Sequence, residues 1–152
     1  MAALKIFSRK HHFKNVSIIG AGLMGSGISQ VCAQNNHKVV IYDQNKSSFD
    51  QSRSTINKSL ERINKKTPID IKNVLNNISF SDDLDSLKSS DLVIEAITEN
   101  LETKKQLFVK LDKIIKKDCV FCSNTSSIPI TDIAKATTRQ DKFFGLHFFN
   151  PG

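Results

Sequence analysis

Three glycines and a later aspartate form the group of residues best suited to hold a ligand. Gly20, Gly22 and Gly25 make a G-x-G-x-x-G pattern directly after the short apolar segment Val16–Ile19. In this pattern the first glycine permits a tight turn, the second lets backbone approach a pyrophosphate, and the third allows a helix to pack on its strand. The N–H groups at the start of that helix then bind phosphate oxygens. We therefore predict a dinucleotide-binding loop formed by Gly20, Ala21, Gly22, Leu23, Met24 and Gly25.

Asp43 ends the next apolar segment, His37–Tyr42. A carboxylate at this position accepts hydrogen bonds from a ribose 2′-OH and repels the 2′-phosphate of NADP, so the predicted cofactor is NAD. The alternative is a glycine-rich turn in some other α/β protein, but strand, glycines, helix, second strand and acid all occur within residues 15–43. A P-loop is excluded because no Gly-Lys-Ser/Thr sequence follows the glycines.

Further polar residues follow later apolar segments. They are Glu99, the Ser-Asn-Thr-Ser-Ser stretch at 123–127, and the His-Phe-Phe-Asn stretch at 147–150. Ligands of parallel sheets bind outside the carboxyl ends of the strands, so we expect these residues to line one cleft. Taken alone, a single histidine such as His147 is more often structural than catalytic.

The elements that must position these residues follow from hydrophobic periodicity. Strands are predicted at Val16–Ile19, His37–Tyr42, Ile78–Phe80, Leu92–Ile97, Val120–Cys122 and Phe143–Phe149. Helical segments are predicted after Gly25 and at Lys46–Lys66, Ile69–Leu75, Asp82–Leu87, Leu101–Ile115 and Pro129–Ala136. Strands that alternate with helices predict right-handed crossovers. The expected fold class is α/β: a Rossmann-type, doubly wound, mostly parallel sheet with helices on both faces.

Composition bounds the possible functions. The chain has 152 residues, enough for one domain, and no apolar run long enough to cross a bilayer. The net charge is +7, but the first 14 residues contain four basic and no acidic residues, which leaves 18 basic against 15 acidic residues in the remainder. This modest excess favours an anionic ligand such as a nucleotide or CoA, and neither a nucleic-acid partner nor a membrane is expected.

The same charge distribution divides the chain into a basic leader, residues 1–14, and a domain, residues 15–152. The leader resembles a short mitochondrial presequence, which predicts the mitochondrial matrix, although a disordered tail in a cytoplasmic protein is the open alternative. Cys119 and Cys122 form a C-x-x-C on a predicted strand, where residues three apart face opposite sides. We expect buried, reduced thiols and no metal site.

Four stretches together carry a resemblance to a known family. They read I-I-G-A-G-L-M-G-S-G-I, D-L-V-I-E-A-I-T-E-N-L, S-N-T-S-S and G-L-H-F-F-N-P. In this order and at these separations they resemble the NAD-binding domain of L-3-hydroxyacyl-CoA dehydrogenases of fatty-acid β-oxidation, over residues 15–152. The short-chain mitochondrial type is the most similar, because the glycine motif begins close to the N-terminus.

The resemblance implies a cofactor site. The glycine loop and Asp43 would hold the adenosine half of NAD. Glu99 and Lys104 would meet the ribose and nicotinamide side. Ser126 and Asn150 would lie where cofactor and acyl-CoA substrate meet.

It also implies a substrate site and a base. Ser59 and Lys66 lie on one face of a predicted helix and match CoA-contacting positions, whereas spacing alone favours a Lys66 that only complements the helix dipole. His147 would be the general base that takes the proton of the 3-hydroxyl as hydride leaves C3, a role suited to imidazole at neutral pH.

The chain departs from the family after His147. The acidic partner of the base and the C-terminal helical domain, which closes the cleft and forms the family's homodimer, are absent from the 152 residues. We expect a fragment that comprises the cofactor domain. Two rival hypotheses stay open: a non-catalytic NAD(H)-binding fragment or structural relative, and a dehydrogenase of another 3-hydroxy acid, which G-L-H-F-F-N-P disfavours.

Overall fold

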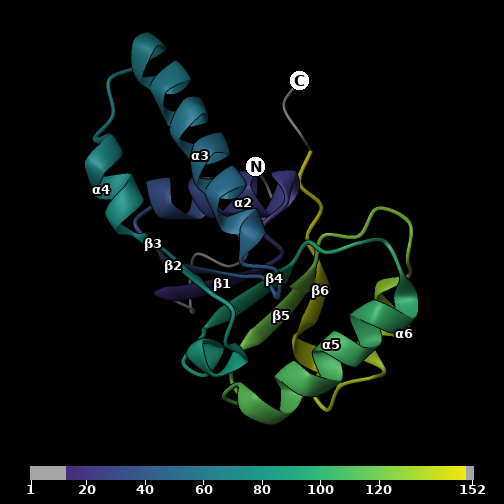
Figure 1. Ribbon diagram of the computed structural model, residues 1–152. Coiled ribbons are helices and arrows are strands. Elements are labelled where there is room, and N and C mark those ends of the chain that lie inside the picture. Colours follow the sequence, from purple (N-terminus) through teal and green to yellow (C-terminus); the bar gives the residue numbers. More distant parts are fainter. Residues whose placement is uncertain (1–12, 150–152) are drawn as a thin grey trace.

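A six-stranded sheet forms the centre of the molecule in a computed structural model that describes residues 13–149 (Figure 1). The strands lie in the order β3-β2-β1-β4-β5-β6, and all five neighbouring pairs are parallel. Their bounds are β1 Asn15–Ile19, β2 Lys38–Tyr42, β3 Ile78–Ser81, β4 Leu92–Glu95, β5 Val120–Ser123 and β6 Phe143–Gly145. The predicted fold class is therefore confirmed.

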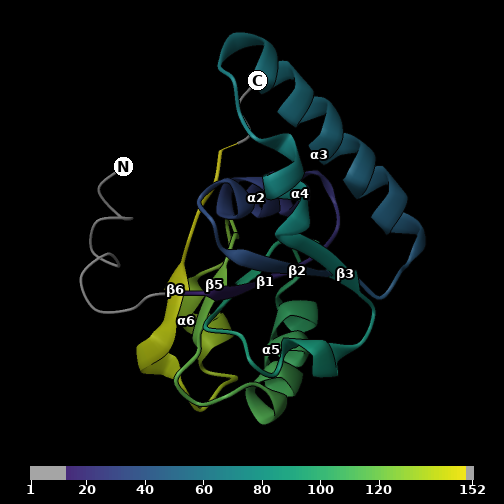
Figure 2. The same cartoon turned by 90° about the vertical axis from the view of Figure 1, so that its left-hand side faces the viewer.

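Helices cover both faces of this sheet (Figure 2). The α-helices are α2 Leu23–Gln34, α3 Ser47–Lys66, α4 Ile71–Asn76, α5 Leu101–Ile114 and α6 Ile130–Ala134, and the 3₁₀ turns are η1 Leu84–Leu87 and η2 Gln140–Lys142. One core packs under α2, α3 and α4, and a second packs under α5, α6 and η1. Each predicted helical segment between residues 46 and 136 overlaps one of these elements.

The strands contribute side chains to both cores because successive side chains point to opposite faces of the sheet. Ile18 and Ile94 lie in the first core, whereas Ile19 and Val93 lie in the second. All four are at most 2% exposed. Apolar residues on both faces are the expected pattern for a parallel sheet buried between helices.

Two predicted strands are too long. β4 ends at Glu95 and not Ile97, and β6 ends at Gly145 and not Phe149. Both strands end where their pairing with β5 ends. The last paired residue of β5 is Ser123, which lies opposite Glu95 of β4 on one side and opposite Gly145 of β6 on the other. Without a neighbouring ladder the chain beyond those residues turns away, and this places Glu99 and His147 in loops.

Some predicted features lie beyond the described residues. Most of the leader, residues 1–12, and the candidate Asn150 fall outside them. Within residues 13–149, no helix combines the length and apolar character needed to span a bilayer. The same stretch holds no group of three or more His, Cys, Asp or Glu side chains able to bind a metal.

Candidate functional site

The glycine loop joins β1 to α2, and two of its glycines are required by the fold. Gly20 has a positive φ of 111°, and a Cβ there would lie 2.6 Å from the Ala96 carbonyl oxygen. A Cβ on Gly25 would lie 1.8 Å from the Gly20 carbonyl oxygen, because the helix packs directly on the turn. Both positions therefore exclude a side chain by contact with backbone.

Gly22 differs from its two neighbours in the motif. Its φ of −72° and ψ of −172° are accessible to any residue. A Cβ built on Gly22 would meet nothing within 4 Å. The protein's own packing thus gives no reason for a glycine here, whereas a ligand that approaches the backbone closely would.

The N-terminus of α2 lies next to the open space at Gly22. Gly22 is the N-cap, no side chain caps the helix, and the first turn carries no acidic residue. Leu23, the first helical residue, is 61% exposed. The uncapped N–H groups and the positive end of a 12-residue helix suit a phosphate group.

Asp43 lies beside this loop at the end of β2. Its Oδ2 accepts a hydrogen bond from the Ala21 N–H at 2.9 Å, and its Oδ1 accepts one from the Asn45 N–H at 2.9 Å. The structure therefore brings together the predicted acid and the predicted glycine loop. Each carboxylate oxygen keeps a lone pair for a further donor such as a ribose hydroxyl.

A second polar group lies across β1, after β4 and β5. Glu99 precedes α5, and its Oε1 accepts hydrogen bonds from the N–H groups of Ser126 (3.1 Å) and Ser127 (3.2 Å). The hydroxyls of Thr125 and Ser127 donate to the same oxygen. The predicted residues Glu99 and Ser126 are thus in contact, 27 positions apart in the sequence.

These contacts control the ionisation of Glu99. Partial burial alone would raise its pKa, but the hydrogen bonds from Thr125 and Ser127 and the positive charge of Lys104 lower the pKa to about 2. Glu99 is therefore a carboxylate at any physiological pH, although its side chain is 37% exposed.

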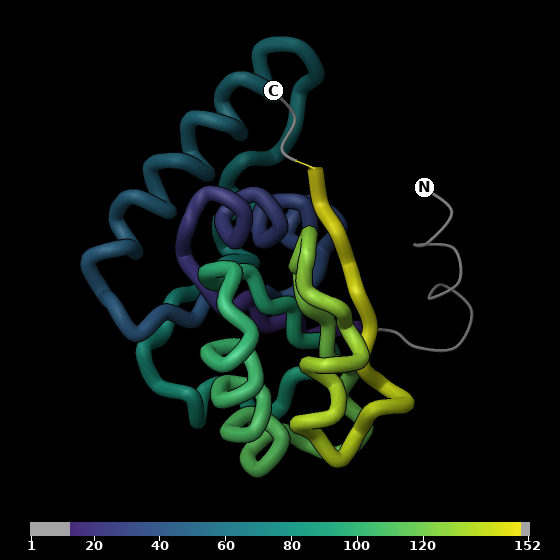
Figure 3. Tube along the Cα trace, turned by 90° about the vertical axis from the view of Figure 1, so that its right-hand side faces the viewer, coloured from purple at the N-terminus to yellow at the C-terminus, as the bar shows by residue number. Residues whose placement is uncertain are grey.

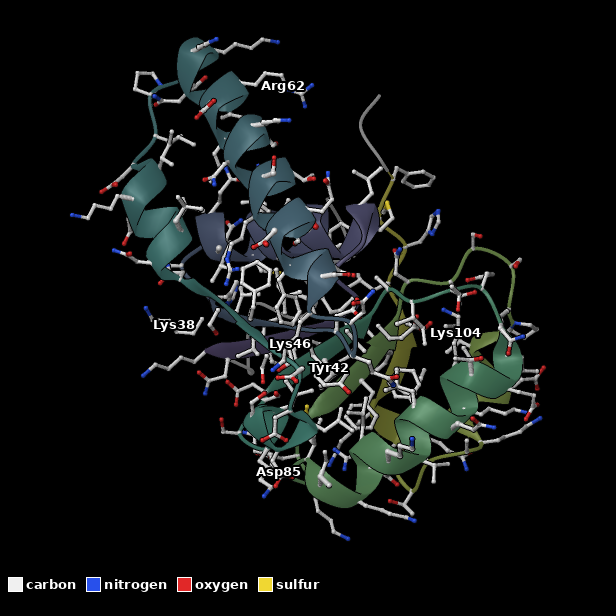
Figure 4. All side chains as sticks on the ribbon, in the orientation of Figure 1. Lys38, Tyr42, Lys46, Arg62, Asp85 and Lys104 are labelled. Carbon is white, nitrogen blue, oxygen red and sulfur yellow. The ribbon has the colours of Figure 1, made fainter. Side chains whose placement is uncertain are left out.

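Lys104 lies on α5, where Figure 4 labels it, and its side chain is fully buried. Its ammonium nitrogen is 2.5 Å from Glu95 Oε1 and 3.5 Å from Glu99 Oε2. Sequence reasoning did not single out Glu95, which is also completely buried. Two opposite charges, one in an apolar strand and one in the apolar stripe of a helix, were the signal that could have found this pair.

His147 lies two residues beyond β6 and is held next to the same turn by its neighbours. The Leu146 N–H donates to the Ser123 carbonyl at 3.1 Å, and the Phe148 N–H donates to Asn124 Oδ1 at 2.8 Å. The imidazole is exposed and meets the Phe149 ring edge-on, at 4.6 Å between centroids. The predicted base therefore shares one edge of the sheet with Glu99 and Ser126.

A groove of about 660 Å³ lies between α2, α3 and the segment after β6. Figure 3 shows that segment beside α2. Ser59, Lys58 and Arg62 contribute polar atoms from α3, and Leu23, Ile63 and Phe149 contribute apolar surface. Lys66, at the end of α3, is exposed and does not line the groove. Of the two predicted CoA contacts, the groove therefore contains Ser59.

These features together define a Rossmann-type dinucleotide-binding domain. β1 lies between β2 and β4, so the strand order reverses beside the glycine loop. In folds of this kind a dinucleotide binds across such a switch point, with its diphosphate at the helix N-terminus. Asp43 stands on one side of that point, and Glu99, Ser126 and His147 stand on the other.

Comparison with known proteins identifies the family. Residues 15–152 match the family described as 3-hydroxyacyl-CoA dehydrogenase, NAD binding domain. The chain belongs to this family, which confirms the predicted cofactor, NAD, and the predicted resemblance.

Individual relatives agree with this assignment. The chain is 46% identical to the mitochondrial hydroxyacyl-coenzyme A dehydrogenase of Sus scrofa over 95% of its length and 49% of that protein. It is 40% identical to a probable 3-hydroxybutyryl-CoA dehydrogenase of Bacillus subtilis over 91% of its length and 49% of that protein. The chain spans about half the length of these relatives.

Solved structures give the same result. The crystal structure of (S)-3-hydroxybutyryl-CoA dehydrogenase PaaH1 from Ralstonia eutropha superposes with a TM-score of 0.88 at 40% identity. The match covers 92% of this chain and 50% of that one. The likeness thus extends through the sheet and both helix layers.

Proposed function

We propose that this chain is the cofactor domain of an enzyme that oxidises L-3-hydroxyacyl-CoA to 3-ketoacyl-CoA with NAD. The observation that carries the proposal is the space at Gly22, which the fold leaves open between an uncapped helix N-terminus and Asp43. Family membership supports the choice of NAD and the class of substrate. Asp43 would accept hydrogen bonds from the adenosine ribose and disfavour NADP.

The family resemblance suggests a chemical role for each residue, and its place in the structure supports that role. NAD, when bound, supplies the hydride acceptor. His147 would take the proton of the 3-hydroxyl as the C3 hydride leaves, and its exposure next to Phe148, which is hydrogen-bonded to Asn124, supports this role. Ser126 would contact both ligands, and the Glu99 carboxylate would accept hydrogen bonds from a ribose hydroxyl. Asn150, the fourth residue we assign to the cleft, lies outside the described residues.

The substrate CoA would lie along the α2–α3 groove. Ser59 lines the groove, and Lys58 and Arg62 add positive charge that suits the phosphates of CoA. Lys66 would reach the ligand from the end of α3. The apolar surface of Leu23 and Phe149 nearest the glycine loop would face the acyl chain.

A mitochondrial β-oxidation enzyme is the biological setting that we propose. The support is the likeness to mitochondrial enzymes from several mammals and the basic, acid-free first 14 residues. Fusing these 14 residues to a fluorescent protein tests the location, because a matrix signal is expected and a diffuse cytoplasmic signal would refute it.

Two measurements on the purified chain test the proposed activity. NADH fluorescence titration should show saturable binding, and absorbance at the NADH band should fall when acetoacetyl-CoA is added. Binding without turnover would identify this chain as a non-catalytic NAD(H)-binding module. No binding by a folded chain would refute the proposed function.

The base is tested by His147→Gln in a preparation that shows turnover. We expect turnover to fall by about 10²- to 10⁴-fold, the usual contribution of general acid–base catalysis, with NADH affinity little changed. Equal turnover would remove the catalytic role of His147.

A further inference from the structure

A second carboxylate follows the neighbouring strand next to Asp43. Ser81, the last residue of β3, lies opposite Tyr42, the last residue of β2. The Asp43 N–H donates to the Ser81 carbonyl at 3.2 Å, so the chain that leaves β3 passes directly beside Asp43. The next residue along that chain is Asp82. Asp82 therefore follows β3 at the same edge of the sheet as the proposed ribose site.

The ionisation of Tyr42 shows that several negative charges lie near this edge. Burial raises the pKa of the Tyr42 hydroxyl. Three carboxylates raise the pKa further, those of Asp43, Asp82 and Asp83. Asp83 has a structural use, because its side chain accepts a hydrogen bond from the Asp85 N–H at 2.9 Å and caps the η1 turn. Like charges on neighbouring strands repel each other, so Asp82 needs a compensating charge.

Lys46 supplies that charge. Its ammonium lies 3.0 Å from Asp82 Oδ2, and the two side chains are 70% and 44% exposed. The hydrogen bond from Lys46 lowers the pKa of Asp82, so both groups are charged at neutral pH. Lys46 is the N-cap residue of α3 and follows Asp43 closely in the sequence, and Figure 4 labels both Lys46 and Tyr42. An ion pair this exposed contributes little to stability.

We propose that Asp82 is a further specificity-determining residue for the cofactor: it adds a negative charge beside Asp43 and holds the Lys46 ammonium away from the ribose 2′ position. The inference rests on the proposed NAD(H) binding and deepens it. The ribose 2′-hydroxyl of NAD is neutral, whereas a phosphate monoester such as the 2′-phosphate of NADP carries a charge of about −1.5 to −2 at pH 7.

The balance of charges shows why Asp43 alone is an incomplete barrier to that phosphate. The Asp43 oxygens already accept hydrogen bonds from the N–H groups of Ala21 and Asn45. An unpaired Lys46 beside Asp43 would offset its negative charge and attract a phosphate. With Asp82 present, the three side chains together keep one net negative charge, and the Lys46 ammonium already has a partner.

The test measures NADH and NADPH affinity of the full chain by fluorescence titration at low and high salt. The variant is Asp82→Asn, which removes one charge and frees Lys46 at nearly constant volume. The matched control is Asp85→Asn, whose partner Lys88 lies 2.9 Å away, with both side chains 58% exposed. Asp85 belongs to η1, and Figure 4 shows it well away from Lys46. Urea unfolding checks that each variant is folded.

The expected result is a change in cofactor preference. The ratio of NADH to NADPH affinity should fall roughly 3- to 30-fold in Asp82→Asn at low salt, on the scale of one or two exposed ion pairs. The change should shrink at high salt, because salt screens exposed charges. Asp85→Asn should leave the ratio close to that of the wild type. Adding Lys46→Met to Asp82→Asn should restore part of the preference, because the freed ammonium is then removed.

Each part of the proposal can fail separately. An unchanged ratio in folded Asp82→Asn would refute the role of Asp82, and an equal change in Asp85→Asn would reduce it to a general charge effect. Equal ratios in Asp82→Asn with and without Lys46→Met would refute the claim that Asp82 acts through Lys46. A wild-type chain that does not bind NADH would refute the proposed function, and this inference with it, whereas the other results leave NADH binding intact.

Discussion

Gly22→Ala tests the assignment of the glycine loop without disturbing the fold. A Cβ at this position would have no neighbour within 4 Å, and the backbone angles suit alanine. Loss of glycine flexibility in the unfolded chain should raise the free energy of unfolding by about 0.4–1 kcal/mol. The methyl group would project into the space that we assign to the cofactor diphosphate.

The effect on binding should be large. If the methyl group keeps the diphosphate from one or two amide hydrogens, each lost hydrogen bond to a charged group weakens binding by about 1.5–3 kcal/mol. NADH affinity should therefore fall roughly 10-fold to 100-fold or more. The assays are NADH fluorescence titration for affinity and urea unfolding for stability.

Two other glycines provide controls. Gly27 lies in α2 and also has open space around a built Cβ, so Gly27→Ala should raise helix stability by about 0.5–1 kcal/mol and leave NADH affinity unchanged. Gly25→Ala would place its Cβ 1.8 Å from a carbonyl oxygen and should destabilise the protein by about 3 kcal/mol. Wild-type NADH affinity in Gly22→Ala would refute our placement of the diphosphate.

Asp43→Ala removes the acceptor of the Ala21 and Asn45 N–H groups, so NADH titration should show weaker binding and NADPH titration a smaller preference against the phosphorylated cofactor. Arg139→Met leaves the buried Asp112 carboxylate without its 2.6 Å partner, and urea unfolding should show a loss of about 3–5 kcal/mol. Because the Glu99 pKa is lowered from 4.5 to about 2, its contribution to stability is complete above pH 4.5 and lost as the pH falls toward 2. Glu99→Gln should flatten that part of the pH dependence of unfolding, and an unchanged slope would contradict it.

The fold was largely predictable because its signals are local. The apolar run before Gly20 and the helical spacing after it indicated β1 and α2, and both form as predicted. The end of β6 was not predictable from Phe143–Phe149 alone, since it depends on where β5 stops. A strand extends only as far as a neighbouring strand pairs with it, and its own sequence does not show where that neighbour ends.

The members of the candidate site could be proposed from the sequence, but their contacts could not. Asp43 could be assigned from the motif, and Glu99 and Ser126 from the family resemblance. That Glu99 accepts hydrogen bonds from the 125–127 turn depends on residues 26 to 28 positions away. Lys104 shares a stripe with apolar residues of α5, but only the packed structure shows that its charge faces Glu95.

The two cysteines of the C-x-x-C stretch belong to different sides of the sheet. Cys122 packs in the core under α2 and α3, and Cys119 packs in the core under α5 and α6. Burial raises the pKa of each thiol to about 12, so neither reacts while its helix layer is closed. Iodoacetamide should therefore alkylate each cysteine only after the helix layer that covers it has detached from the sheet. Mass spectrometry of the two cysteines separately would measure the rate at which each layer detaches, without an added probe.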